Sequence, residues 1–136
     1  MYEIIDHTAD LGIRVLGKDA ADLFHNGALA LSNLIADLKR PHGTHSTVIQ
    51  VAGDDWADLM VNWLREILYL WTGEEKLVQR VAIESICEKY LVAQVHFDFY
   101  SPQNHILNQE IKAVTYHQIQ VIDTGERWEA TIIFDV

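Results

Sequence analysis

The stretch LVAQVHFDFY, residues 91–100, shows the alternation of apolar and polar side chains that is typical of a strand with one buried face. The side chains expected on that face are Leu91, Ala93, Val95, Phe97 and Phe99. Glu88 and Lys89 are expected to turn the chain, so that residues 77–86 pair with this strand. The stretch therefore predicts an antiparallel sheet with one face against a core and the other in solvent.

Further strands are expected on both sides of this hairpin. Residues 11–16 and 48–51 have strand character in the first half of the chain. Near the end, the turn DTGE over residues 123–126 is expected to join strands 116–122 and 128–134 as a second hairpin. Because hairpins pair their strands in opposite directions, the sheet is expected to be largely antiparallel.

Two helices are expected between the strands, because apolar residues recur there every three or four positions. In the first helix, Asp19 is expected to cap the N-terminus, and Pro41 and Gly43 to stop the helix. Its buried face would consist of Leu23, Phe24, Gly27, Ala28, Leu31, Leu34, Ile35 and Leu38. In the second helix, AGDD over residues 52–55 provides the cap, and Gly73 is expected to close the helix. Its buried face would consist of Trp56, Leu59, Met60, Trp63, Leu64, Ile67, Leu68 and Trp71, which we interpret as core rather than as a ligand-stacking surface.

The order of these elements predicts one α/β domain over residues 1–136. We expect a two-layer sandwich of the α+β type, with two main helices on one side of a largely antiparallel sheet. The chain is 49% hydrophobic and 22% charged, as in globular proteins, and no polar linker or low-complexity run divides it.

The charge of the chain limits the function classes. The formal net charge is -10, which argues against direct binding of a nucleic-acid backbone, because that requires Lys and Arg to neutralise phosphates. RNA is therefore expected to enter only through a partner. No apolar run approaches the ~20 residues that span a bilayer, and the start MYEIID does not read as a signal peptide. These features predict a cytoplasmic location without membrane contact.

The single cysteine and the histidines offer little chemistry. One cysteine excludes an internal disulfide, and Cys87 lies in the strand-like stretch VAIESICEKY, which favours a buried core thiol over a nucleophile. His42 and His45 flank a turn with a spacing that suits a metal ion, but no third ligand is near them. We therefore interpret the segment as a solvated loop. Nucleotide-binding glycine motifs and the GxSxG motif are absent from the sequence.

Acidic residues near both ends of the chain form a more specific pattern. HTADLG, residues 7–12, places a histidine, a hydroxyl and an acid between apolar neighbours, and the chain closes with IIFDV. Asp135 lies directly beside the α-carboxylate of Val136, and Asp10 from HTAD would complete a set of hard oxygen ligands. Because carboxylates this close repel one another, a divalent cation would relieve the repulsion. A Ca²⁺ or Mg²⁺ site and a plain acidic surface loop both remain open from these residues alone.

The segment NQEIKAVTYHQIQV, residues 108–121, adds opposite charges at Glu110 and Lys112. On one face of a strand, these two side chains would form a cross-strand ion pair, which is the simpler interpretation of the pattern.

Four stretches, in this order, resemble the archease family. They are DHTADLGIRVLG at 6–17, VNWLREILYLW at 61–71, EIKAVTYHQIQV at 110–121 and WEATIIFDV at 128–136. With their spacers they cover nearly the whole chain. The resemblance implies a compact α/β domain with an antiparallel sheet.

The resemblance also implies a function. Archeases are accessory proteins of the GTP-dependent RNA-splicing ligase that joins transfer-RNA halves and related cleaved RNAs. They promote guanylylation of the active-site histidine of the ligase, so that the ligase turns over repeatedly. The chain is accordingly expected to be a non-catalytic protein cofactor of that ligase, which is its expected partner.

The site residues that the resemblance implies map onto the acidic pattern. The family has a calcium-like metal site that maps to Asp10 and Asp135, with the terminal carboxylate of Val136 joining them. Lys112 belongs to the same functional cluster. His7 and Glu110 lie in matching motifs and are assigned supporting roles. The expected cofactor is a divalent cation, Ca²⁺ before Mg²⁺.

Two other function classes remain as alternatives. A metal-dependent hydrolase built on Asp10 and Asp135 would need a general base or an open metal position beside a pocket. A general chaperone or interaction module would instead work through an exposed aromatic surface.

Overall fold

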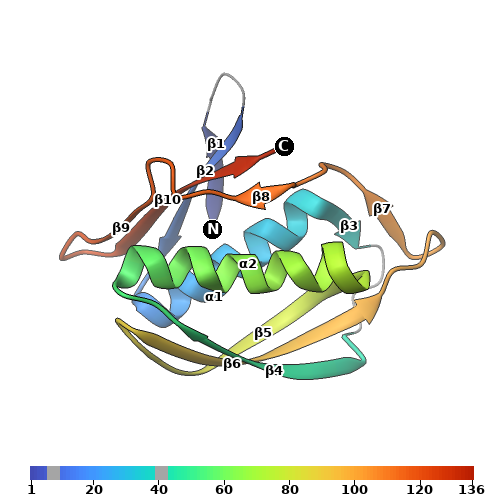
Figure 1. Ribbon diagram of the computed structural model, residues 1–136, viewed down its shortest axis with the longest axis horizontal. Helices are drawn as coiled ribbons and strands as arrows, with labels where there is room; N and C mark the ends of the chain where they lie inside the picture. Colours follow the sequence, from blue (N-terminus) through green and yellow to red (C-terminus); the bar gives the residue numbers. More distant parts are fainter. Residues whose placement is uncertain (6–9, 39–42) are drawn as a thin grey trace.

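The computed structural model describes residues 1–5, 10–38 and 43–136. These residues form ten strands and two helices (Figure 1). In chain order the elements are β1 (Tyr2–Ile5), β2 (Asp10–Gly17), α1 (Ala20–Ile35), β3 (Ala36–Leu38), β4 (His45–Ala52), α2 (Trp56–Glu74), β5 (Lys76–Cys87), β6 (Tyr90–Phe99), β7 (His105–Leu107), β8 (Ala113–Val114), β9 (Gln120–Asp123) and β10 (Trp128–Asp135).

The strands form two main antiparallel sheets. One contains β1, β2, β10 and β8 in that order, with β9 also paired to β10. The other has the order β4-β6-β5, and β3 pairs with β7 in a separate ribbon. The expected mixed α/β fold with two helices and mostly antiparallel strands is confirmed.

The arrangement of the layers differs from the expectation. The helices lie between the two main sheets instead of covering one side of a single sheet (Figure 1). Helix α1 contacts β2 and β5, while α2 contacts β8 on one side and β4 and β5 on the other. The reason is visible in α1, whose buried residues extend beyond a single helical stripe to Ala30 and Ser32. A helix buried over such a wide arc needs cover from two directions.

The two helices pack directly on each other. Trp63 is fully buried, and its indole N–H donates to the carbonyl oxygen of Phe24 at 2.8 Å. Gly27 of α1 faces Met60 and Leu64 of α2, where a Cβ atom on the glycine would lie 3.5 Å from the Met60 sulfur. The second helix therefore has the predicted core face, because Trp63, Leu64, Ile67 and Leu68 are all buried.

Two helix ends lie elsewhere than expected. Helix α1 ends at Ile35, because the chain then pairs with β7, with Leu38 opposite His105. Helix α2 continues through Gly73 to Glu74. Its reversal is made by Glu75, which has φ 54° and donates its N–H to the carbonyls at the helix end. Glycine was therefore the wrong indicator of this helix end.

Three strand predictions also need correction. The strand expected over 116–122 begins only at Gln120, because Gln118 adopts φ 52° in a preceding turn. Phe99 is 51% exposed, although the other four residues of its face are buried. Cys87 is exposed, so the predicted core thiol is wrong. It is the last residue of β5 and pairs with the exposed Tyr90, next to the predicted turn to β6.

Two strand–helix units, β2–α1 and β4–α2, share one local structure. The first enters its helix with GKDAADL (17–23) and the second with GDDWADL (53–59). In both, the aspartate at the third motif position (Asp19 or Asp55) caps the helix and its carboxylate accepts the N–H of the aspartate at the sixth position (Asp22 or Asp58) at 2.8 Å. The carboxylate of the sixth-position aspartate accepts the backbone N–H of the residue before the cap at 2.9 Å. The units therefore repeat side-chain chemistry as well as sequence.

The repeat extends to a glycine and an asparagine. A Cβ atom on the glycine would lie within 2.6 Å of the backbone nitrogen of the motif leucine in either unit, so a larger residue would force the backbone to shift. An asparagine one turn after the sixth-position aspartate donates its side-chain N–H to a carbonyl at the end of the strand, at 2.8 Å in the first unit and 2.9 Å in the second. These positions are Gly17, Asp19, Asp22 and Asn26 in the first unit and Gly53, Asp55, Asp58 and Asn62 in the second.

Candidate functional site

The two aspartates predicted from the ends of the chain lie opposite each other. Strands β2 and β10 are antiparallel, and their register pairs Asp10 with Asp135. Directly opposed residues of an antiparallel pair have Cβ atoms about 4.5–5.5 Å apart on one face of the sheet. Fully buried side chains in both strands, Ile13 and Ile132, hold this register. The fold therefore brings together two carboxylates from distant parts of the sequence.

Lys112 lies at the same end of the sheet. The register of β8 and β10 pairs Ala113 with Asp135, and the backbone N–H of Lys112 donates to the carbonyl oxygen of Asp135 at 2.7 Å. The side chain of Lys112 is exposed. The ends of β10, β8 and β2 meet at the upper edge of the molecule in Figure 1, on the side of the sheet away from the three-stranded sheet. Asp10, Lys112 and Asp135 thus belong to one strand-end cluster.

Glu110 has a different environment from the one expected. Residues 108–112 lie in the connection between β7 and β8, so Glu110 and Lys112 do not share a strand face. Neither of them forms an ion pair with another described residue, and the predicted cross-strand pair is wrong. Glu110 instead borders a cavity of about 190 Å³. The residues lining it are Ile35, Trp71, Leu107, Asn108, Gln109 and Glu110.

The donor atoms at the strand ends suit a hard cation, which binds carboxylate oxygens. The described residues contain no group of three or more His, Cys, Asp or Glu side chains that could hold a metal ion. Asp10 and Asp135 alone would supply two carboxylate ligands, so a cation would need further oxygens from Val136, the backbone or water. Val136 directly follows Asp135 and is half-buried against the core. His7 lies outside the described residues.

His45 belongs to an aromatic surface rather than to the loop that the sequence suggested. It is the first residue of β4 and stacks on Phe97 with 5.6 Å between ring centroids. Phe99 meets it edge-on at 4.9 Å, and Thr44 forms a hydrogen bond with its Nδ1 atom. His42 lies outside the described residues.

A cluster around Tyr116 was not predicted from the sequence. Its hydroxyl donates to the Asp58 carboxylate at 2.6 Å and lies 3.4 Å from Asn62 Oδ1. The Arg65 guanidinium lies 4.8 Å from the centre of the ring and donates to the Val114 carbonyl. The spacing of Asp58, Asn62 and Arg65, which places them on one helix face, was the available signal.

The hydrogen bond changes the ionisation of both of its partners. It holds the pKa of Asp58 below its usual value, and the backbone N–H of Asp54 acts in the same direction. The same bond to Asp58 raises the pKa of Tyr116, because loss of the phenol proton would place two negative charges side by side. The bond thus favours an ionised carboxylate and a neutral phenol.

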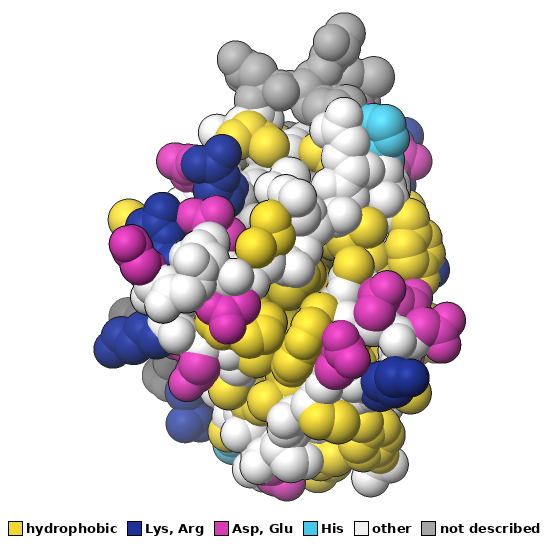
Figure 2. Space-filling view, turned by 90° about the vertical axis from the view of Figure 1, so that its left-hand side faces the viewer, with side chains coloured by type: hydrophobic (Ala, Val, Ile, Leu, Met, Phe, Trp, Pro, Cys, Tyr) yellow, Lys and Arg dark blue, Asp and Glu magenta, His cyan; other side chains and the backbone are white. Residues whose placement is uncertain are grey.

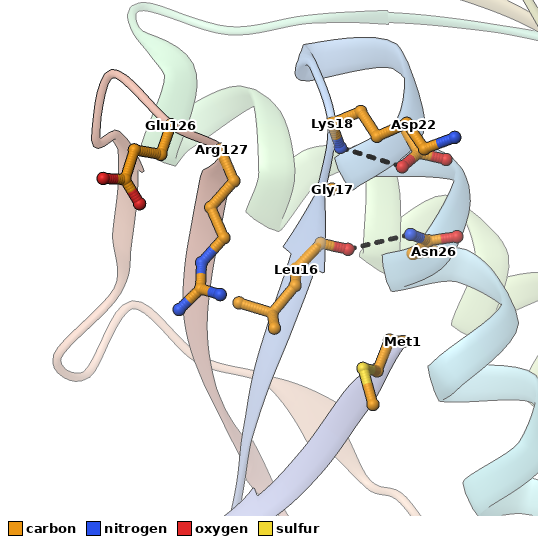
Figure 3. A pocket seen from close by; sticks show the side chains of 8 residues that line it. All are labelled: Met1, Leu16, Gly17, Lys18, Asp22, Asn26, Glu126 and Arg127. Atoms are coloured by element: carbon orange, nitrogen blue, oxygen red, sulfur yellow. Dashed lines mark hydrogen bonds between the residues drawn. The ribbon is translucent and has the colours of Figure 1, made fainter.

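A pocket of about 320 Å³ opens at the other end of β2 from Asp10 (Figure 3). It lies between the start of α1 and the turn that leads into β10. The residues lining it are Met1, Leu16, Gly17, Lys18, Asp22, Asn26, Glu126 and Arg127. The pocket is therefore separate from the strand-end cluster.

The fold and the strand-end cluster define a small α/β protein with two carboxylates on neighbouring strand ends. The model of the Archease protein family (MTH1598/TM1083) matches residues 2–136. The chain belongs to the archease family. This result confirms the resemblance carried by the four sequence stretches.

Individual relatives agree with this assignment. The protein archease of Methanosarcina barkeri is 34% identical over 139 residues, which cover 99% of this chain and 95% of that protein. The protein archease of Pyrococcus furiosus is 31% identical, with 99% and 98% covered. These alignments extend over nearly the full length of each chain.

Two solved structures share the fold. The solution structure of Methanobacterium thermoautotrophicum protein 1598 has a TM-score of 0.83 and 26% identity, covering 99% of this chain and 98% of that one. A crystal structure from Thermotoga maritima, described as an archease and possible chaperone, has a TM-score of 0.66 and 19% identity, covering 100% and 98%. The second likeness shows the fold alone.

Neither helix formed by the described residues is long and apolar enough to cross a membrane.

Proposed function

We propose that the protein activates a GTP-dependent RNA-splicing ligase by promoting guanylylation of the ligase, in the cytoplasm. The observation that carries the proposal is the strand-end cluster of Asp10, Lys112 and Asp135 in a chain of the archease family. These residues occupy neighbouring strand ends, where polar groups can reach a partner without disturbing the core. The protein itself would be a non-catalytic cofactor.

The charge of the chain supports such a partner. A ligase that binds GTP and RNA must present a positive cleft to phosphates, and a protein with a net charge of -10 is attracted to it. The opposed carboxylates would meet this cleft together with one ammonium group, that of Lys112. The cluster would then order the cleft for attack on the α-phosphate of GTP.

We also propose that Asp10 and Asp135 hold one divalent cation, Ca²⁺ or alternatively Mg²⁺, with the carboxylate of Val136 as third ligand. Opposed carboxylates repel each other, and a bound cation offsets this repulsion. When bound, the ion would supply positive charge at the strand ends. His7 and Glu110 would have supporting roles, as the resemblance implies.

Multiple-turnover RNA ligation with the partner ligase tests the activation. Asp10→Ala, Lys112→Ala and Asp135→Ala should each remove the acceleration and leave the circular-dichroism spectrum unchanged. The matched controls are Glu84→Ala and Lys89→Ala, which remove exposed charges from β5 and from the turn between β5 and β6. Folded Lys112→Ala and Asp135→Ala variants that stimulate as well as the parent protein would rule the cluster out.

Calorimetry tests the cation separately. Asp135→Asn preserves the shape of the side chain but removes its charge, and should weaken Ca²⁺ binding, as should a few residues appended after Val136. Equal Ca²⁺ affinity in all three proteins would contradict the proposed ligand set.

The alternative functions give different results in simple assays. A metal-dependent hydrolase would turn over phosphoesters in the absence of the ligase. A general chaperone would suppress aggregation of unrelated proteins, and Asp10→Ala would not change that activity. Either result, without ligase activation, would replace the proposed function.

A further inference from the structure

The repeated strand–helix units give the pocket of Figure 3 an internal counterpart. Asp58 and Asn62 in the second unit correspond to Asp22 and Asn26 in the first. In the second unit, both side chains contact the hydroxyl of Tyr116. In the first unit, both line the open pocket (Figure 3). The pocket is thus lined by Asp22 and Asn26, whose counterparts in the second unit, Asp58 and Asn62, contact a phenol hydroxyl.

The hydrogen-bonding atoms of the two aspartates agree, whereas Asn26 Oδ1 lies 3.1 Å from His25 Nδ1 and Asn62 Oδ1 lies 3.4 Å from the Tyr116 hydroxyl. One carboxylate oxygen of each aspartate, Oδ2, accepts a backbone N–H at 2.9 Å, from Lys18 in the first unit and Asp54 in the second. The other oxygen of Asp58, Oδ1, accepts the Tyr116 hydroxyl at 2.6 Å. Asp22 therefore has a corresponding oxygen with the capacity to accept a hydroxyl in the pocket.

The charges of the pocket fit a neutral ring better than an ion. Two acidic and two basic side chains line it, namely Asp22, Glu126, Lys18 and Arg127. A phosphate or an ammonium ligand would meet like charges there. Arg127 lines the pocket, and its guanidinium lies 2.8 Å from the Glu129 carboxylate. A ring in the pocket would lie against this guanidinium as the Tyr116 ring lies against that of Arg65.

The position of the pocket indicates the source of the ring. Sites for free small molecules enclose most of the ligand surface, whereas Lys18, Glu126 and Arg127 are all exposed. Figure 2, which views the left-hand side of the molecule in Figure 1, shows acidic side chains on both sides of an apolar band. A ring that enters an open pocket of this kind needs a second anchor, which a protein chain supplies.

We propose that this pocket binds a tyrosine side chain of a partner protein, with the tyrosine hydroxyl donating to Asp22. The inference does not rest on ligase activation, because the pocket and the strand-end cluster lie at opposite ends of β2. It assigns a docking position to a part of the surface outside the cluster.

Amide NMR titration tests the proposal with N-acetyl-L-tyrosinamide as the probe. Saturable shifts are expected at Lys18, Asp22 and Asn26, with binding about threefold to tenfold weaker for N-acetyl-L-phenylalaninamide, which lacks the hydroxyl. Asp22→Ala should lower the affinity for the tyrosine probe to that of the phenylalanine probe. Equal binding of the two probes to the parent protein would overturn the proposal without any variant.

The chain provides its own positive control. Tyr116→Ala vacates the second unit, so the same probe should then also shift Asp58 and Asn62. Shifts at Asp58 without shifts at Asp22 would show that only the second unit recognises a phenol, and would overturn the proposal, as would shifts at neither. A third arm uses p-cresol: if it binds more tightly than the tyrosine probe, the pocket is a small-molecule site and not a docking position.

Discussion

The β2–α1 and β4–α2 units enter their helices through the same hydrogen bonds, yet the equivalent aspartates Asp22 and Asp58 have different neighbours. Asp58 is bonded to Tyr116 from the connection between β8 and β9, whereas Asp22 borders a pocket. The local motif determines how each helix begins. The neighbours of the aspartate depend on which distant segment reaches it. The same helix-start motif can therefore be occupied by a side chain of the chain itself in one unit and border an open pocket in the other.

The helices of the two units also differ in the size of the side chains at their contact. At this contact Gly27 of α1 faces the larger side chains of Met60 and Leu64 of α2. The two units thus share the hydrogen bonds at their helix N-termini but differ in the size of the side chains where α1 and α2 meet. Four sets of substitutions test this comparison, and their expected effects decrease in the order given.

The largest effect is expected at the contact of the helices. Leu64→Ala removes a fully buried side chain at Gly27 and should lower the free energy of unfolding by about 2–5 kcal/mol, because the cavity cannot close. Urea denaturation measures it. Glu66→Ala, at an exposed position of α2, is the control and should change little. An unchanged midpoint for Leu64→Ala would show that the helices do not pack as described.

The motif glycines test whether the two helix starts are equally tight. Gly17→Ala and Gly53→Ala force a Cβ atom to within 2.4 Å and 2.6 Å of a backbone nitrogen, and each should cost on the order of 1–3 kcal/mol, with Gly17 the more sensitive. Thermal unfolding measures the loss. Gly27→Ala is the matched control, since its Cβ atom meets neighbours only at ordinary contact distance. It should stabilise α1, because alanine is the better helix former. Equal behaviour of all three variants would refute the steric argument.

The helix caps provide a finer test of equivalence. Asp19→Ala and Asp55→Ala each remove one cap, and should each cost about 1 kcal/mol. Urea denaturation of the two single variants and the double variant measures whether the losses are similar and additive. A much larger loss for one cap would mean that the units are not equivalent at their starts.

The smallest expected effect concerns ionisation. Asp58 has a lowered pKa, so its bond to Tyr116 contributes stability above the usual carboxyl pKa and is lost as the pH falls through the lowered value. Tyr116 has a raised pKa, so this contribution is present below the usual phenol pKa, about 10, and is lost as the pH rises through the raised value. Tyr116→Phe should return the pKa of Asp58 towards its usual value, as measured by NMR titration of the carboxyl carbon. An unmoved pKa would exclude the hydroxyl as the main cause.

Local patterns predicted those parts of the fold that depend on neighbouring residues. The hairpin of β5 and β6 and the core face of α2 follow from alternation and helical spacing within a single stretch. The end of α1 at Ile35 does not, because it depends on pairing between β3 and the distant strand β7. The division of the strands into two sheets has the same non-local origin.

The candidate sites differ in the same way. Asp10 and Asp135 were expected to converge because acids stood at two apparent strand ends, and the register of β2 and β10 pairs them. The bond between Tyr116 and Asp58 joins segments that no local pattern connects. The repeated motif was visible in the sequence, but only by comparison of the chain with itself.

The position of β10 has a consequence for synthesis. This strand lies between β2 and the strands β8 and β9, so the five-stranded sheet cannot close until residues 128–135 have left the ribosome. The three strands of the other sheet and both helices emerge earlier, and they form from a continuous part of the chain. A nascent chain therefore carries an unpaired edge on β2 through most of its translation. Translation that stalls just before Trp128 would leave this edge available to other chains, which is where aggregation of an incomplete product would begin.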